Sequence, residues 1–228
     1  MLGMKAWLET RWRLLFVLTF PVVALAFRYG GLASNADARR MLGTMSFLSV
    51  FAATYLAGTG IKTQPALRQT KGVHGSLYFT LSLPVSRFRL LAARSLAGLL
   101  EFAGLNVVIY SVAWTLFPLV RGDSKPIDLL ELILASTVCV ICYYFMSVLL
   151  ATVLEDAWQI WGNVLLFGGM QWLNFRFHLP ASFDLTAFAG ESSPLLTHRL
   201  PWIAMSISAC LAVLLFVAAL RIVQTREY

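Results

Sequence analysis

The sequence predicts an all-α, polytopic membrane protein with six transmembrane helices, and three observations lead to that prediction. Apolar residues make up 59% of the 228-residue chain, whose mean hydropathy is +0.74. Only 13% of the residues are charged, whereas a soluble globular domain has roughly 25%. The apolar residues also form blocks of about 20, the length at which a helix rising about 1.5 Å per residue crosses a hydrocarbon core of about 30 Å.

The chain is expected to enter the membrane through an interfacial helix. Residues 1–13 mix tryptophans with charged side chains, the pattern of an amphipathic helix that lies along the inner membrane surface. The first span is expected over about residues 14–33 and the second over about 42–61, with a short outer turn at 34–41 between them. Residues 14–228 then form one transmembrane domain.

The longest polar interval, residues 62–94, determines the predicted orientation of the protein. It carries six basic residues and no acidic residue. Lys and Arg near the ends of spans are retained on the cytoplasmic side of a membrane, so this loop is expected to face the cytoplasm. Eleven of the eighteen Lys and Arg residues lie on the inner side in this topology, which also places both termini in the cytoplasm.

The remaining four spans follow the same length rule. They are expected over about residues 95–119, 128–154, 157–177 and 201–223. Glu155 and Asp156 form a very short inner turn between two of these spans, and residues 178–200 form the largest outer segment.

Four polar side chains inside the predicted spans are candidates for a translocation path. Glu101 lies about two turns inside its span, where a carboxylate is energetically expensive and often functional. A structural salt bridge with Arg94 is the alternative for this residue. Asn163, Gln171 and Asn174 lie in the fifth span, where their amides must find partners between helices or line a cavity.

The cysteines and histidines do not form a predicted metal or disulfide site. Cys139, Cys142 and the third cysteine fall within predicted spans, so no disulfide framework outside the membrane is expected. The first two are interpreted as small apolar residues of a packed helix and not as a metal or redox pair. His74 is predicted inside, and His178 and His198 outside, so the three histidines cannot share one metal ion.

Sequence motifs for catalysis and nucleotide binding are missing. The chain has no GxSxG or HExxH pattern and no Gly-Lys dipeptide, which a phosphate-binding P-loop requires. The net charge of +7 follows the predicted topology and does not form one solvated patch, so nucleic acid is not an expected partner. We therefore expect no catalytic residue, metal or cofactor in this chain, and another subunit must supply any nucleotide energy.

One short motif connects the chain to a known family. Residues 83–87 read Leu-Pro-Val-Ser-Arg, within the segment 77–101 that leads from the basic loop into the third span. This segment resembles the membrane subunit of ABC-2 type (type V) ABC exporters, whose first cytoplasmic loop commonly carries such a string before a basic helix start. The predicted layout is similar as well, with an amphipathic entry helix, six spans and a long first inner loop.

The resemblance implies a division of labour between subunits. Residues 1–13 would correspond to the connecting helix of that family, and the loop 62–94 would contain a coupling helix that docks on a separate ABC ATPase. The coupling residues are then Gly72, His74, Gly75, Leu77, Tyr78, Leu83, Pro84 and Arg87. ATP and Mg²⁺ would bind to two copies of that ATPase, and a second permease subunit, identical or homologous, would complete the translocation path.

Two alternative functions remain open at the level of the sequence. The chain could be a membrane scaffold or accessory subunit that transports nothing, or a membrane-embedded enzyme that uses Glu101 or the Glu155 and Asp156 pair. We expect an exporter subunit in a bacterial cytoplasmic membrane, surrounded by lipid. Its apolar, aromatic spans accommodate a hydrophobic or amphipathic cargo more easily than a bare ion.

Overall fold

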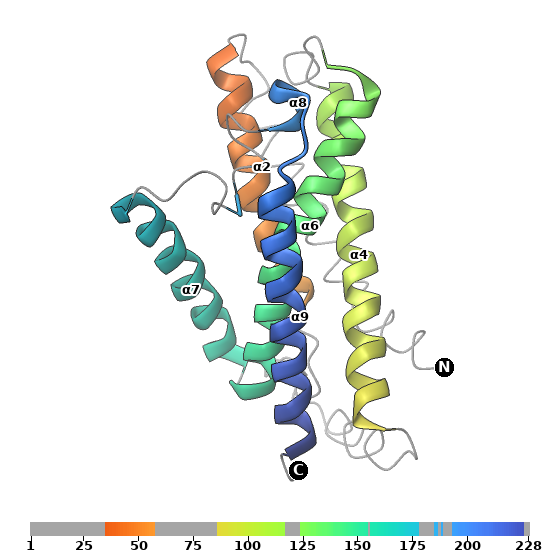
Figure 1. The fold of residues 1–228 in the computed structure, drawn as a ribbon, viewed down its shortest axis with the longest axis vertical. Helices are drawn as coiled ribbons and strands as arrows, with labels where there is room; N and C mark the ends of the chain where they lie inside the picture. The colour runs from red at the N-terminus through yellow and green to blue at the C-terminus, as the bar shows by residue number, and fades with distance from the viewer. Residues whose placement is uncertain are drawn as a thin grey trace.

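The computed structural model describes residues 35–57, 86–116, 124–154, 156–177, 185–186, 188 and 193–225. In these parts of the chain the protein is all-helical, as predicted, and contains no strand. The helices are α2 (Asn35–Leu56), α4 (Arg87–Leu116), α6 (Pro126–Val153), α7 (Asp156–Phe177), α8 (Pro194–Thr197) and α9 (Trp202–Thr225) (Figure 1).

Helix α6 is the centre of the bundle, because it packs against α2, α4, α7, α8 and α9. Its buried face includes small residues such as Ala135, Ser136 and Cys139, which let neighbouring helices approach closely. The contact with α9 is the most extensive, and there the Ser208 hydroxyl donates a hydrogen bond to the carbonyl oxygen of Cys139 over 2.9 Å. Cys142 is also buried, so both cysteines serve as packing residues.

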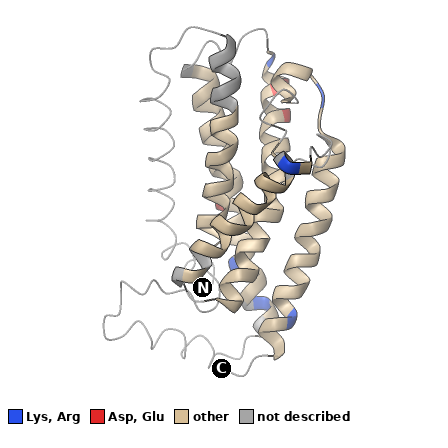
Figure 2. Ribbon diagram, turned by 90° about the vertical axis from the view of Figure 1, so that its left-hand side faces the viewer, with Lys and Arg blue, Asp and Glu red and all other residues tan. Residues whose placement is uncertain are grey.

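Three of the described helices are long and apolar enough to cross a membrane. The qualifying segments are Leu91–Thr115, Pro126–Val153 and Trp202–Thr225. Lys, Arg, Asp and Glu residues of the described helices lie mostly toward the two ends of the bundle, with few between them (Figure 2). These three helices have the length and hydropathy of membrane spans, in line with the membrane character predicted from composition.

The other predicted spans do not reach the same criterion within the described residues. The apolar part of α2, Gly43–Leu56, is shorter than a full span. Helix α7 has 22 residues, but polar residues such as Asn163 and Gln171 lower its hydropathy. The expected first span at residues 14–33 and the entry helix at residues 1–13 lie outside the described residues.

Two helix starts differ from the sequence prediction. Helix α2 begins at Asn35, although an outer turn was predicted at residues 34–41, because this segment contains alanines and arginines that favour helix. Helix α4 begins at Arg87, eight residues before the predicted start of the third span at residue 95. The Ser86 hydroxyl accepts a hydrogen bond from the backbone N–H of Arg89 over 3.3 Å and so caps the helix.

Helix α7 diverges from the bundle after a short connection to α6 (Figure 1). The Phe167 ring packs against Phe47, with ring centroids 5.8 Å apart, and against Tyr143, at 5.7 Å. Beyond this point most described side chains of the helix are exposed, and a Cβ added at Gly168 or Gly169 would meet no described atom within 4 Å. The α7 helix is therefore attached to the bundle through its first half.

Candidate functional site

One polar site of the described residues is a set of hydrogen bonds that joins α2, α4 and α7 to α6. The Tyr144 hydroxyl donates to the carbonyl oxygen of Ser95 on α4 over 2.8 Å. One turn later, the Ser147 hydroxyl donates to the carbonyl oxygen of Thr54 on α2 over 2.9 Å. The Asn163 amide nitrogen on α7 donates to the Ser147 oxygen, also over 2.9 Å. We call these five residues the junction cluster.

A glycine lets α2, α4 and α6 meet at the junction cluster. The Tyr144 hydroxyl lies so close to Gly98 on α4 that a Cβ at this position would collide with it. The carbonyl oxygen of Leu56 on α2 lies 3.5 Å from the same position. The Tyr144 side chain is fully buried, so the packing around Gly98 has little room to adjust.

The hydrogen bonds determine how the Asn163 amide is oriented. Since Ser147 donates its hydroxyl proton to Thr54, its oxygen can accept from Asn163, and the Asn163 nitrogen must face it. The amide oxygen Oδ1 then faces away, is buried, and has no hydrogen-bond partner. Asn163 is 8% exposed, so this oxygen is shielded from solvent.

The same arrangement occurs a second time, between α4 and α6. The Thr137 hydroxyl donates to the carbonyl oxygen of Ile133 over 2.8 Å and accepts from the Asn106 amide nitrogen over 3.2 Å. The Asn106 Oδ1 atom is also buried without a hydrogen-bond partner. Hydroxyl groups of α6 thus hold asparagine amides of two neighbouring helices.

Glu101 lies beside the junction cluster. It is half-buried on α4, and its carboxylate is close enough to the Tyr144 phenol to interact with it electrostatically. The structure brings Glu101 and Asn163 to the same central helix, at Tyr144 and Ser147. The salt bridge between Glu101 and Arg94 stays a prediction.

The other predicted path residues do not join this cluster. Gln171 is half-buried on α7, eight residues after Asn163 and therefore about 12 Å further along the helix. The backbone of Asn174 belongs to α7, and its side chain lies outside the described residues. Asn163 is thus the α7 amide that contacts α6 in the junction cluster.

Most of the predicted coupling residues lie outside the described part of the chain. These are Gly72, His74, Gly75, Leu77, Tyr78, Leu83 and Pro84. Arg87 is described in its backbone only, as the first residue of α4. The coupling role of these residues stays a prediction, and the described chain resumes at the capped start of α4.

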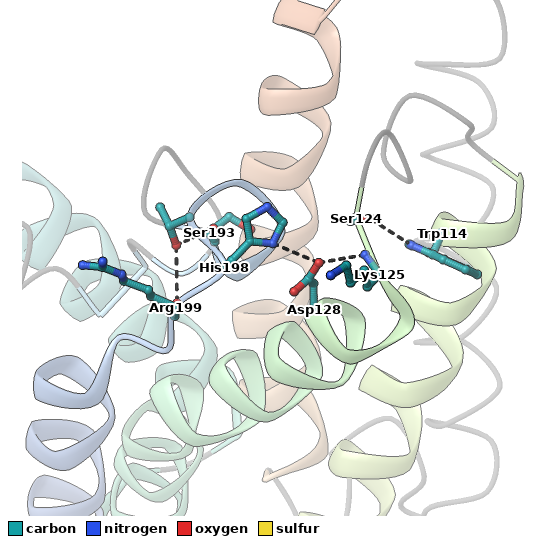
Figure 3. A network of polar contacts seen from close by, with 8 residues as sticks. Trp114, Ser124, Lys125, Asp128, Ser193, His198 and Arg199 are labelled. Carbon is teal, nitrogen blue, oxygen red and sulfur yellow. Dashed lines mark hydrogen bonds and ion pairs between the residues drawn. The ribbon is translucent and has the colours of Figure 1, made fainter.

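A second polar cluster lies at the opposite end of α6 and was not predicted from the sequence (Figure 3). An oxygen of Asp128 accepts a hydrogen bond from the backbone N–H of Lys125 over 2.7 Å, which caps the start of α6. The same oxygen lies 3.0 Å from Nδ1 of His198. We call these three residues the cap cluster.

The Trp114 indole N–H donates to the Ser124 hydroxyl over 3.2 Å beside the cap cluster and joins the end of α4 to the segment before α6. Within the described ranges, no group of three or more His, Cys, Asp or Glu residues could hold a metal ion. The cap cluster is therefore a set of hydrogen-bonding and charged groups at a helix end.

The side chains of the two clusters carry hydroxyls, one amide, one carboxylate, one imidazole and the ammonium group of Lys125. The imidazole of the cap cluster pairs with a carboxylate that is itself capping a helix, and the junction cluster contains no acid–base pair among its five members. What the junction cluster does physically is hold α2, α4 and α7 against α6. Comparison with known proteins found no matching family model, curated protein or solved structure.

Proposed function

We propose that the chain is the membrane subunit of an ATP-driven exporter of the ABC-2 type. In this proposal six helices span a bacterial cytoplasmic membrane, both termini are cytoplasmic, and the chain forms half of the translocation path. Two copies of a separate ATPase bind ATP and Mg²⁺. The observation that carries the proposal is the Leu-Pro-Val-Ser-Arg string at residues 83–87, which leads directly into the capped start of the long helix α4.

The position of the junction cluster supports a mechanical role for α4. Helix α4 has 30 residues and therefore a length of about 45 Å. Ser95, which binds Tyr144, lies only eight residues after Arg87, the first residue of the helix. A displacement of the coupling loop would therefore reach α6 within about three turns of α4.

The hydrogen bonds of α6 would then distribute this displacement. Ser147 lies one turn after Tyr144 and binds both Thr54 on α2 and Asn163 on α7. A movement that enters through α4 would thus act on two further helices, one of which contacts the described bundle up to Phe167. Packed helices transmit such movements as small rigid-body shifts.

Asn163 takes a mechanical role in this proposal, because its amide is used in the junction cluster. Glu101, Gln171 and Asn174 stay proposed as path residues. The cargo is proposed to be hydrophobic or amphipathic, and the second permease subunit is either identical or homologous.

Uncoupling of ATP hydrolysis from helix movement is the test of this proposal. Spin labels at Leu100 on α4 and Trp172 on α7, both exposed, report the distance between the two helices in a cysteine-free background. With the ATPase bound in nanodiscs, ATP should change this distance in the otherwise unaltered protein. In Arg87→Glu and Gly75→Trp, ATP hydrolysis should continue while the distance no longer responds.

The matched control is Arg221→Glu, which reverses a charge on an exposed residue of α9, at the inner end of that helix in the proposed topology. It should respond to ATP as the unaltered protein does. A normal response in Arg87→Glu and Gly75→Trp would contradict the assignment of the coupling loop. No response in any form would instead favour a scaffold that transports nothing.

A further inference from the structure

His198 holds a strained position at the end of α8. It is the C-cap residue of this short helix, with a φ of 50° in the left-handed region, and its backbone N–H donates to the carbonyl oxygen of Pro194 over 2.9 Å. Among the described residues it is the one non-glycine with a positive φ. Gly or Asn normally occupies such a position, because a Cβ disfavours this conformation. The His198 side chain makes a polar contact from this position.

The contact partner is Asp128 in the first turn of α6. The Nδ1 atom of His198 lies 3.0 Å from the Asp128 oxygen that also caps α6 through Lys125 (Figure 3). The two side chains differ greatly in exposure, at 58% for His198 and 6% for Asp128. The carboxylate is thus held in place by the helix cap, while the imidazole is open to solvent.

Among the residues that the structure describes, few other charged groups lie near this pair. On α6, Lys125 precedes Asp128 and Glu131 follows it by one turn, while Arg199 follows His198 and extends away from Asp128 (Figure 3). Helix α2 starts at the same end of the bundle, and the first ten residues of α9 contain no charged residue (Figure 1). The charged residues in the first turns of α2 are Asp37, Arg39 and Arg40.

We propose that His198 and Asp128 form a proton-dependent latch that fastens the segment 193–200 to the start of α6. Imidazole is the side chain whose charge changes between pH 5 and 8, whereas a carboxyl group stays ionised over that range. A protonated imidazole makes a charge-assisted hydrogen bond to the carboxylate, which is about twice as strong as the bond of a neutral imidazole. The latch therefore strengthens as the pH falls from 8 toward 5 and loosens as the pH rises.

The latch has a structural consequence for the top of the bundle. The segment 193–200 connects directly to α9, the helix that packs most extensively on α6. Opening of the latch would remove the polar contact that holds the end of α8, while Pro194 and Leu195 stay buried and Asp128 still caps α6 through Lys125. The latch is independent of the proposed export function, because it acts at the opposite end of α6 from the junction cluster.

Hydrogen exchange of the full-length protein in nanodiscs tests the latch. The backbone N–H groups of Leu196, Thr197 and His198 are bonded to carbonyl oxygens of Ser193 and Pro194 and report on opening of this segment. After correction for the intrinsic effect of pH on chemical exchange, opening should be about fivefold more frequent at pH 8 than at pH 5.5. A fivefold change corresponds to about 1 kcal/mol.

Two kinds of variant separate the latch from other titrating groups. His198→Asn removes the titrating group but suits the left-handed position, and Asp128→Asn removes the carboxylate charge. Both should open equally often at the two pH values. The control His74→Gln/His178→Gln, which keeps only His198, should retain the fivefold change.

Three results would overturn the latch. The first is equal opening of the unaltered protein at both pH values. The second is an undiminished pH dependence in His198→Asn, a variant that keeps a residue suited to the left-handed position but lacks the imidazole. The third is a loss of the pH dependence in the control that keeps His198.

Discussion

The close approach of Tyr144 to Gly98 gives a sharp prediction for the junction cluster. The substitution Gly98→Ala places a methyl group where the Tyr144 hydroxyl lies, with the backbone of Leu56 only 3.5 Å away. Tyr144 is fully buried and is bonded to Ser95, so it cannot move aside without losing that hydrogen bond. We expect the substitution to destabilise the bundle.

The magnitude follows from two opposing effects. Overpacking of a filled core costs about 1–3 kcal/mol, whereas replacement of Gly by Ala inside a helix gains about 1 kcal/mol. Gly104→Ala on the same helix is the matched control, because no atom lies within 4 Å of a Cβ at that position. The free energy of unfolding of Gly98→Ala should therefore lie about 1–3 kcal/mol below that of Gly104→Ala.

A second substitution identifies the colliding atom. Tyr144→Phe removes the hydroxyl and by itself costs about 0.5–1.5 kcal/mol for the lost hydrogen bond. The nearest remaining ring atom, Cζ, lies 3.4 Å from the Cβ position of residue 98, which is an ordinary contact. In this background the difference between Gly98→Ala and Gly104→Ala should fall below about 0.5 kcal/mol.

Reversible unfolding in mixed micelles, followed by circular dichroism, measures these free energies. The account requires a large difference between the two alanine variants when Tyr144 is present and almost none when it is Phe. A difference that persists in the Phe background would refute the reasoning, because the collision would then lie elsewhere. Equal stabilities in the Tyr background would refute it as well.

Three further predictions concern hydroxyls and amides. Ser147→Ala should cost about 1–3 kcal/mol of unfolding free energy, because the buried Asn163 amide loses its hydrogen-bond partner. Adding Asn163→Leu should restore most of this loss. A double variant as unstable as Ser147→Ala would contradict the hydrogen bond between the two residues. Asn106→Leu should change the stability by less than about 1 kcal/mol in the same assay, because the leucine also removes a buried oxygen without a hydrogen-bond partner, and a loss above about 2 kcal/mol would show that the amide is essential. Ser86→Ala should increase hydrogen exchange in the first turn of α4, where unchanged exchange would mean that Ser86 is not the cap.

The sequence predicted the helical fold because its signal is local. A block of about 20 apolar residues indicates a membrane-spanning helix whatever its tertiary contacts, so the sequence predicted helices that overlap α4, α6 and α9. Helix starts depend on single hydrogen bonds, and α4 starts at the Ser86 cap, eight residues before the predicted span at residue 95. The departure of α7 from the bundle was not predicted, because lipid-facing and core-facing apolar residues have the same composition.

The functional clusters were harder to predict, because their partners are distant in the sequence. Tyr144 binds a residue 49 positions away and Ser147 binds one 93 positions away. Asn163 was expected to need a partner between helices, but nothing local identified Ser147 as that partner. From the sequence, His198 was considered only as a metal ligand. Its pairing with Asp128 could not be predicted, because it depends on how the segment 193–200 packs against the start of α6.

Purification of the protein from native membranes tests the central claim most directly. The claim is that a separate ATPase moves α4 through the loop at residues 62–94. The expected complex contains two membrane subunits and two ATPase subunits. It should lose the ATPase subunits when residues 62–85 are replaced by a glycine-serine linker of equal length. Recovery of the protein without an ATPase, or retention of the ATPase by the linker variant, would contradict the claim.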